Sequence, residues 1–328
     1  MPANLPPMYF DAEKRFREAR TPESKIEALE EMLTIMPKHK GTDKLRADLR
    51  RRIAKLKELA QQKKGGAKRD AAYMVEKEGA AQVLVVGAPN TGKSSLVAAL
   101  TNASPEVGEF PHTTWRPTPG MASYENIQFQ LVDTPPITRE YLDPWVSDLM
   151  RRADIILILV DLHDDPLQQL EESLSILQEF RIYPVDFPIP GGLKKPPFIK
   201  KILVAANKVD DEDHLEDYHA FLELSEMDLP CTWISSGSGR NLNGLLQLLY
   251  EMSGIIRVYT KVPGKEPNKK APFVLPRMAT LEELAAKIHK DFVSKLKFAK
   301  IWGTGVFDGQ MVQRDYVLQD GDVVEIHI

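Results

Sequence analysis

The stretch Gly87-Ala88-Pro89-Asn90-Thr91-Gly92-Lys93-Ser94 (GAPNTGKS) decides the fold of this chain. Two glycines enclose four residues, and lysine and serine follow, which is the pattern of a phosphate-binding loop. The glycines let backbone N–H groups wrap a phosphate, Lys93 adds positive charge, and Ser94 offers a hydroxyl to Mg²⁺. The apolar residues 83–86 precede the loop and a helical pattern follows at residues 93–100, so the loop is expected to join a buried strand to a helix.

Strand and helix patterns alternate from about residue 80 to residue 254. Further β-rich runs lie at residues 129–132, 155–160 and 202–205, and further helical patterns lie at residues 141–152, 167–180, 215–224 and 241–252. Apart from residues 129–132, the runs are apolar throughout, as expected for strands that are buried on both faces. The alternation predicts an α/β domain with a doubly wound, mostly parallel sheet.

Two regions flank this domain. Residues 1–75 are rich in charge and lack strand signals, and helical spacing at residues 22–36 and again at residues 42–59 predicts a helical hairpin followed by a linker. Residues 255–328 contain two strand patterns, a helical pattern at residues 280–293 and a final strand pattern, which together indicate a ubiquitin-like β-grasp unit. The expected domains are therefore residues 1–75, 80–254 and 255–328.

A second motif, Asn207-Lys208-Val209-Asp210, follows closely on the predicted strand at residues 202–205. The carboxylate of Asp210 can accept hydrogen bonds from N1–H and the exocyclic amine of guanine, whereas adenine offers no such pair of donors. The motif therefore predicts a guanine nucleotide rather than ATP. Ser235 and Ser236 follow a short apolar stretch and could cover the guanine O6 with backbone N–H groups, and a simple turn is the alternative there.

A candidate Mg²⁺ site follows residues 129–132. Asp133 ends that strand, where a carboxylate can hold Mg²⁺ through water. In the preceding loop a threonine is expected to close on Mg²⁺ and the γ-phosphate, and Thr114 is a better candidate than Thr113. GTPases usually place a glycine three residues after this aspartate, and its N–H meets the γ-phosphate. Here that position is Pro136, which has no N–H, so the contact is lost unless a neighbour replaces it.

Composition limits the class of protein. The chain has 328 residues, 43% of them hydrophobic, and a net charge of −4, which fits a globular protein of two or three domains and predicts no DNA partner. A single cysteine, Cys231, permits neither an internal disulfide nor a multi-cysteine zinc site. The longest run of large apolar residues, 155–160, is too short to cross a bilayer, and the first residues do not resemble a signal peptide. A cytoplasmic protein without a membrane partner is expected.

Together these motifs resemble those of Obg-related GTPases, and most closely the developmentally regulated GTP-binding protein (DRG) family with its C-terminal TGS domain. The resemblance covers about residues 45–328. It is carried by residues 87–95 (GAPNTGKSS), 110–114 (FPHTT) with Pro119-Gly120, 207–210 (NKVD), 256–261 (IRVYTK), 287–290 (KIHK), 301–303 (IWG) and 318–324 (LQDGDVV). The interval from Asp133 to Asn207 is too short for the extra inserted domain of eukaryotic members.

The resemblance implies hydrolysis of GTP to GDP with Mg²⁺ and K⁺. Asn90 stands where potassium-activated GTPases carry an asparagine that helps to hold K⁺. Ile137 stands where many GTPases keep a catalytic glutamine, and an apolar side chain cannot orient water. Hydrolysis is therefore expected to be slow and to depend on a cation or an activating protein partner.

The candidate site residues follow from the motifs and the resemblance together. The residues expected to bind the nucleotide and its metal are Gly87, Ala88, Pro89, Asn90, Thr91, Gly92, Lys93, Ser94, Ser95, Asp133, Asn207, Lys208, Asp210, Ser235 and Ser236. Within the whole site, Lys93, Asn90 and Thr114 are expected to act in catalysis, and Ser94, Thr114 and Asp133 to hold Mg²⁺.

The partner beyond the nucleotide is expected to be a ribosome or RNA. Residues 44–69 contain eleven lysines and arginines and two acidic residues, which favours contact with a phosphate backbone. A solvated helix that packs on the GTPase domain is the alternative for this segment. Two other functions stay open: a catalytically weak nucleotide sensor or scaffold that a partner activates, favoured by Pro136 and Ile137, and a phosphate-loop kinase or ATPase, which the guanine motif disfavours.

Overall fold

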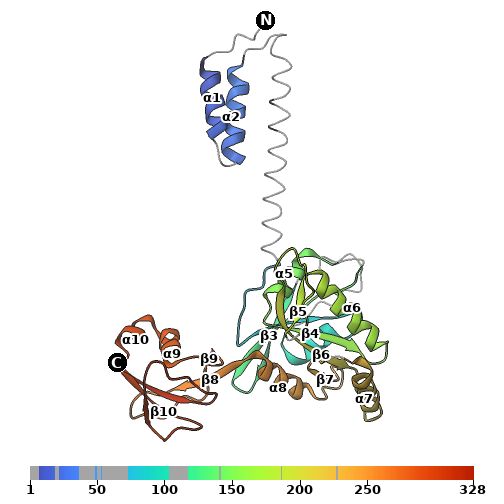
Figure 1. The fold of residues 1–328 in the computed structure, drawn as a ribbon, viewed down its shortest axis with the longest axis vertical. Coiled ribbons are helices and arrows are strands. Elements are labelled where there is room, and N and C mark those ends of the chain that lie inside the picture. The colour runs from blue at the N-terminus through green and yellow to red at the C-terminus, as the bar shows by residue number, and fades with distance from the viewer. Residues whose placement is uncertain are drawn as a thin grey trace. The chain divides into compact units, whose positions relative to one another are not determined.

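The computed structural model of the chain describes residues 7–18, 22–36, 49, 53, 73–102, 117–139, 142–185, 187–226 and 228–328. The chain divides into two compact units, Met1–Met74 and Val75–Ile328. The second unit contains two separate sheets, which are drawn from cyan through green to yellow and in orange to red in Figure 1. The predicted boundary at residues 254 and 255 lies inside this second unit.

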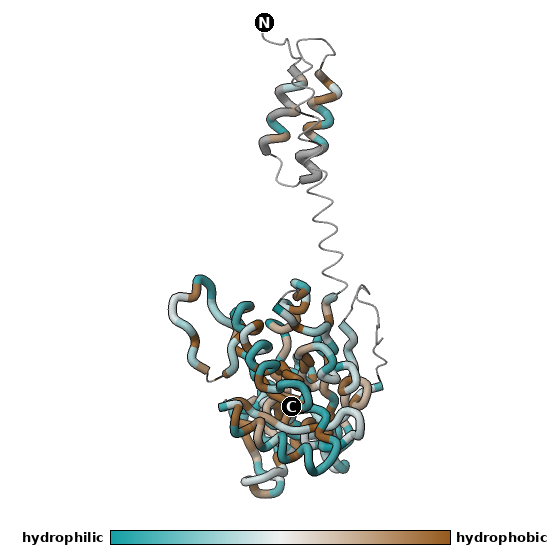
Figure 2. The backbone as a smooth tube through the Cα atoms, turned by 90° about the vertical axis from the view of Figure 1, so that its right-hand side faces the viewer, coloured by the Kyte–Doolittle hydropathy of each residue, from teal (hydrophilic) through white to brown (hydrophobic). Residues whose placement is uncertain are grey.

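The described part of the first unit is mainly helical. Helices α1 (Pro7–Glu18) and α2 (Pro22–Ile35) pack against each other through a buried cluster that includes Ala12 and Leu29. Both helices carry hydrophilic and hydrophobic residues in turn, which are teal and brown in Figure 2. The sequence predicts residues 42–59 as the partner of α2, whereas the described partner is α1. Of residues 42–59 only Leu49 and Ile53 are described, and both are helical and join the same cluster.

The larger sheet of the second unit has seven strands. Its strands are β1 (Gln82–Val86), β2 (Thr118–Tyr124), β3 (Ile127–Asp133), β4 (Ile155–Asp161), β5 (Ile182–Pro184), β6 (Phe198–Asn207) and β7 (Cys231–Trp233). They follow the order β2-β3-β1-β4-β6-β5, with β7 also paired to β6. All pairs are parallel except that of β2 with β3, so the predicted doubly wound α/β sheet is confirmed.

Helices cover both faces of this sheet. They are α4 (Lys93–Leu100), α5 (Pro144–Arg152), α6 (Pro166–Glu179), α7 (Asp213–Ser225) and α8 (Leu242–Ser253). Alternate residues of β4 enter opposite cores: Ile156 joins the cluster with α5, α6 and α7, while Leu157 joins the cluster with α4 and α8. Because both faces are buried, β4 is apolar at every position before Asp161, as its sequence predicts.

The smaller sheet forms the predicted β-grasp unit. Its elements are β8 (Ile255–Thr260), β9 (Phe273–Pro276), α9 (Leu281–Ile288), α10 (Lys290–Lys295), β10 (Phe298–Trp302), β11 (Gln310–Val312) and β12 (Val323–His327), and its strand order is β11-β10-β12-β8-β9. The prediction of a single helix at residues 280–293 is wrong, because two helices, α9 and α10, occupy this segment. His289 has an extended backbone (φ −166°, ψ 142°) that ends α9, and its ring accepts a hydrogen bond from the Asp291 N–H at the start of α10.

The larger sheet and the β-grasp sheet are joined at the turn between β2 and β3. Arg257 of β8 forms ion pairs with Glu125 in that turn and with Asp320, and its guanidinium lies 4.6 Å from the ring centre of Tyr250. The adjacent turn residue, Asn126, donates a hydrogen bond to the hydroxyl of Tyr259. The tip of the β2–β3 hairpin is therefore held by the β-grasp unit.

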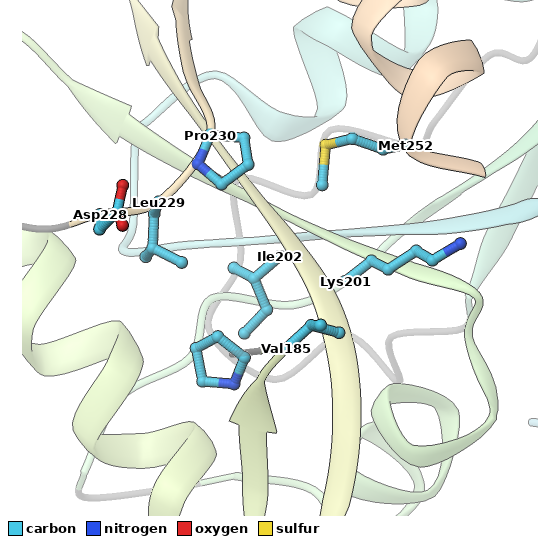
Figure 3. Close-up of a pocket in the computed structure, with 8 residues that line it drawn as sticks. Val185, Lys201, Ile202, Asp228, Leu229, Pro230 and Met252 are labelled. Carbon is cyan, nitrogen blue, oxygen red and sulfur yellow. The ribbon is translucent and has the colours of Figure 1, made fainter. Parts of the chain in front are cut away.

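A hollow of about 500 Å³ lies near the amino end of β6 (Figure 3). Ile202, Pro230 and Met252 give it a largely apolar lining, and the ammonium group of Lys201 is already bonded to the Ser253 carbonyl at 2.9 Å. Parallel α/β sheets bind ligands at the carboxyl ends of their strands. The nucleotide site is therefore expected at the other end of β6, where Asn207 lies.

Candidate functional site

The loop between β1 and α4 requires glycine at both ends. Gly87 has φ 151°, and a Cβ atom there would collide with the Leu159 carbonyl of the neighbouring strand β4. Gly92 has φ 92°, and a Cβ atom there would collide with the amide nitrogen of Asn207. No other residue type fits both the backbone angle and the space, so the glycine pattern reflects close packing of the loop against β4 and β6.

Lys93 lies at the first position of α4 and is folded back over the loop. Its ammonium group donates hydrogen bonds to the carbonyls of Ala88 at 2.6 Å and Gly87 at 3.2 Å. Burial lowers the pKa of Lys93 to about 8, and the nearby Asp133 opposes that shift. A buried cation at a helix N-terminus is well suited to bind a phosphate, which would favour its charged form.

The affinity for GDP is expected to fall as the pH rises above about 8. A bound phosphate stabilises the charged form of Lys93, so the pKa in the complex is higher than the value of about 8 in the free protein. Between the two values binding takes up a proton, and the affinity falls by up to about tenfold per pH unit. Titration calorimetry from pH 7 to 9.5 would measure this. Lys93→Arg, which stays charged, should remove the dependence, and a flat wild-type profile would contradict the assignment.

Ser94 and Asp133 bring two oxygen ligands together. The Ser94 hydroxyl donates to Oδ2 of Asp133 at 2.7 Å, and Asp133 is fully buried at the end of β3. Burial raises the pKa of Asp133, and the hydrogen bond from Ser94 opposes that shift. Oδ1 of Asp133 is buried without a hydrogen-bond partner among the described residues. A hydroxyl beside an unsatisfied carboxylate oxygen fits Mg²⁺, whereas the third candidate ligand, Thr114, lies outside the described residues.

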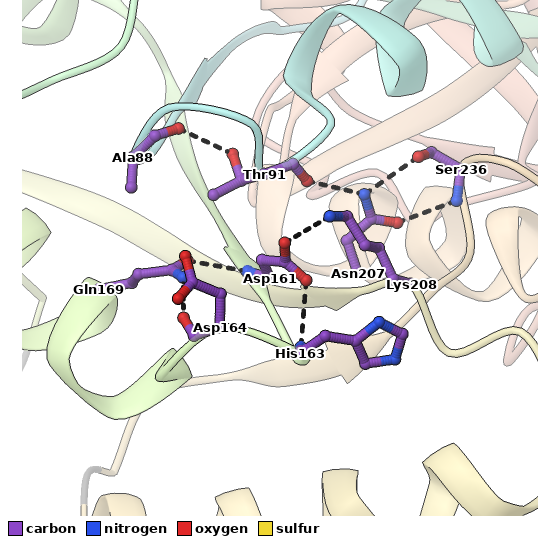
Figure 4. Close-up of polar contacts among 9 residues, drawn as sticks. All are labelled: Ala88, Thr91, Asp161, His163, Asp164, Gln169, Asn207, Lys208 and Ser236. Atoms are coloured by element: carbon purple, nitrogen blue, oxygen red, sulfur yellow. Dashed lines mark hydrogen bonds and ion pairs between the residues drawn. The ribbon is translucent and has the colours of Figure 1, made fainter.

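Asn207 connects three of the predicted motifs (Figure 4). Its amide nitrogen donates to the Thr91 carbonyl at 2.8 Å and to the Ser236 hydroxyl at 3.0 Å. Its amide oxygen accepts the N–H of Ser236 at 2.9 Å. The phosphate loop, the end of β6 and the turn after β7 therefore meet at one buried side chain, although they are far apart in the sequence.

The predicted base-reading residue Asp210 is exposed, three residues beyond the end of β6. Oδ1 of Asp210 accepts a hydrogen bond from the hydroxyl of Ser235, which is fully buried and itself accepts the N–H of Ser238 at 3.0 Å. Ser235 thus fixes the orientation of the Asp210 carboxylate. The structure gives Ser235 a side-chain contact here, whereas the sequence suggested only its backbone N–H.

Asp161 is a site residue that the sequence motifs do not contain. It ends β4 in register with Asn207 of β6, and it forms an ion pair with Lys208 (Figure 4). The same carboxylate accepts the N–H of His163 at 3.1 Å. The ion pair fixes the position of the Lys208 side chain, next in sequence to Asn207. A polar residue at the carboxyl end of a buried strand, next to the strand that ends in Asn207, is the sequence signal for it.

The remaining candidates lie at the rim of the site. Pro89, Asn90 and Ser95 are exposed, and Asn90 has a left-handed backbone with φ 61°. Ile137 is buried in the core with 3% of its surface exposed. The buried side chain of Ile137 is therefore directed away from solvent and offers no polar group to a water molecule.

The phosphate loop, the buried Asp133 and the guanine motif at the end of a parallel strand define a GTPase with a C-terminal β-grasp domain. Residues 82–187 match the family described as 50S ribosome-binding GTPase, and residues 256–328 match the TGS domain. The chain is 32% identical to an uncharacterized GTP-binding protein of Methanocaldococcus jannaschii, over 93% of each chain. It is a GTP-binding protein that belongs to the developmentally regulated GTP-binding protein (DRG) family.

Two further comparisons describe the relationship. Developmentally-regulated GTP-binding protein 1 of Xenopus laevis is 26% identical over 92% of this chain and 98% of its own. The YchF GTPase of Schizosaccharomyces pombe has the same fold, with a TM-score of 0.51 and 12% identity over 77% of this chain and 99% of that one. The alignment with the Methanocaldococcus protein spans 365 positions, so that relative has residues without a counterpart among the 328 of this chain. Within the described residues, no helix combines the length and apolar character needed to cross a membrane.

Proposed function

We propose that this protein is a slow, K⁺-stimulated GTPase that acts on ribosomes or RNA in the cytoplasm. The observation that carries the proposal is the Asn207 network, because it holds the phosphate loop and the base-reading residues in one site. Lys93 and the N-terminus of α4 would bind the phosphates, and Asp210 would read the guanine. Ser94, Asp133 and Thr114 would hold Mg²⁺, which neutralises charge on the β- and γ-phosphates when bound.

The slow rate of GTP hydrolysis is inferred from Ile137, the residue after Pro136. Ile137 is buried and cannot orient the attacking water, so positioning would fall to other groups. Asn90 is exposed next to the phosphate loop, where its amide oxygen could help to hold K⁺. A cation there would supply positive charge to the transition state. The ribosome as partner is supported by the match to a ribosome-binding GTPase family, whereas the basic residues 44–69 lie almost wholly outside the described part of the chain.

GTP hydrolysis is expected to be faster in K⁺ than in Na⁺ at matched ionic strength with Mg²⁺ present. Asn90→Ala should remove the difference between the two cations while GDP still binds. Asn243→Ala, an exposed asparagine on α8, is the matched control and should behave as wild type. Phosphate release under multiple turnover measures the rates. Equal rates in K⁺ and Na⁺ would contradict a role for K⁺.

A second candidate function is a nucleotide-bound scaffold that only a partner activates. The burial of Ile137 and the proline at residue 136 favour it, because neither residue can serve hydrolysis directly. The same assay separates the two functions. Bound GTP that is not hydrolysed in either cation would support the scaffold, and ribosomes would then be added to look for activation.

A further inference from the structure

The segment from Thr134 to Ile137 follows the candidate Mg²⁺ ligand Asp133 and lies beside the phosphate loop. We propose that this segment keeps the same conformation whether or not a γ-phosphate is bound. We further propose that Pro136 is the residue that limits how well the site distinguishes GTP from GDP. The proposal rests on the proposed function, because it assumes that both nucleotides occupy this site.

The segment has no backbone donor to offer a phosphate beyond Thr134. Pro135 and Pro136 have no N–H. Ile137 is the next residue with an N–H, and it donates to the Gly87 carbonyl at 3.2 Å. The neighbour that could have replaced the missing contact is therefore already committed to the phosphate loop itself.

Both ends of the segment are anchored to β1 and the start of the loop that follows it. Thr134 is fully buried, and its hydroxyl donates to the Val85 carbonyl at 2.7 Å. At the other end the Ile137 side chain belongs to the same buried cluster as Val86. Moving either end would leave a buried polar group unpaired or expose an apolar side chain, and the two prolines between them have restricted φ angles.

These contacts make the segment insensitive to the nucleotide. A ligand shifts a conformational equilibrium only by its difference in affinity for the two conformations. Beyond Thr134 the γ-phosphate finds no free backbone donor in this segment, so it gains nothing from moving residues 135–137. Any preference for GTP over GDP must then come from the phosphate loop, from Mg²⁺ or from other parts of the chain.

The test compares the affinities of GDP and a non-hydrolysable GTP analogue for the wild type and for Pro136→Gly, in the full chain with Mg²⁺. Glycine supplies the missing N–H and the backbone freedom to turn it toward the phosphate. We expect the preference for the triphosphate to rise about tenfold or more, as one hydrogen bond to a charged group provides. Pro135→Ala adds an N–H one residue earlier and should leave the preference unchanged.

Amide hydrogen exchange of wild-type Ile137 gives a second, independent readout. Its protection is expected to be the same with GDP and with the GTP analogue, because the N–H stays bonded to Gly87. Protection that changes with the γ-phosphate would overturn the proposal, and so would an unchanged nucleotide preference in Pro136→Gly. Failure of the wild type to bind GDP would instead overturn the proposed function, so the two failures are distinguishable.

Discussion

Replacing Lys93 by alanine is expected to weaken the binding of GDP and GTP by at least about a hundredfold, or ~3 kcal/mol. The ammonium group already lies over the loop, bonded to the carbonyls of Gly87 and Ala88, and a phosphate would replace these partners. A charge-assisted hydrogen bond and the Coulomb attraction to the phosphates are lost together. Titration of each nucleotide with Mg²⁺ present measures the loss.

The same substitution should not destabilise the nucleotide-free protein. The pKa of Lys93 is lowered on burial, so at pH 7 the fold carries a charge that burial disfavours, and alanine removes it. The melting temperature of the free protein should stay equal or rise. Lys195→Ala, an exposed lysine in the loop before β6, is the matched control and should alter neither property. Retention of tight binding by Lys93→Ala would show that the loop does not hold the phosphates.

Replacing Asp210 by asparagine is expected to move the base preference from guanine toward xanthine. The carboxylate can accept hydrogen bonds from both N1–H and the amine of guanine. An asparagine has one oxygen and one NH₂ group, and the NH₂ group cannot accept a hydrogen bond from guanine. Xanthine carries an oxygen in place of that amine and can accept the amide N–H. We expect GDP to bind about tenfold to a hundredfold more weakly, and xanthosine diphosphate to bind more tightly than it does to the wild type.

The neighbouring aspartate provides the control for this substitution. Asp211 accepts the N–H of His214 at 3.0 Å, which an asparagine oxygen can also do, so Asp211→Asn should keep the guanine preference. The affinities of the two diphosphates for each variant decide the matter. An Asp210→Asn protein that still selects guanine as the wild type does would show that another group reads the base.

The sequence predicts a strand or loop well when every position in it meets the same requirement, such as burial on both faces. Strand β4 is buried on both faces and therefore apolar, and the phosphate loop needs glycines where its backbone angles are positive. Strand β2 pairs antiparallel with β3 at the sheet edge and mixes small, polar and aromatic residues, so its pattern is weak. Strands β5 and β7 have three residues each, which is too short for any periodicity.

The sequence predicts those functional groups of the candidate site that lie together in one segment. It predicts less well the contacts between segments that are far apart in the sequence. The phosphate loop and the guanine motif can be read from local order, because each follows one strand. The contact of Asn207 with Thr91 and Ser236, and that of Asp161 with Lys208, depend on which strands are neighbours in the sheet. The break at His289 likewise depends on a local hydrogen bond of its ring, which helical periodicity does not reveal.

The hairpin of β2 and β3 connects the TGS sheet to the nucleotide site. One end of strand β3 is Asp133, and the turn at its other end contacts the TGS sheet. In that turn one residue forms an ion pair with Arg257 and the next donates a hydrogen bond to Tyr259. Seven residues of extended strand span about 20 Å, so one continuous strand runs from the turn that contacts the TGS sheet to Asp133. We expect rotation of that sheet either to break the ion pair of Arg257 with Glu125 or to displace the hairpin that ends in Asp133, the candidate Mg²⁺ ligand.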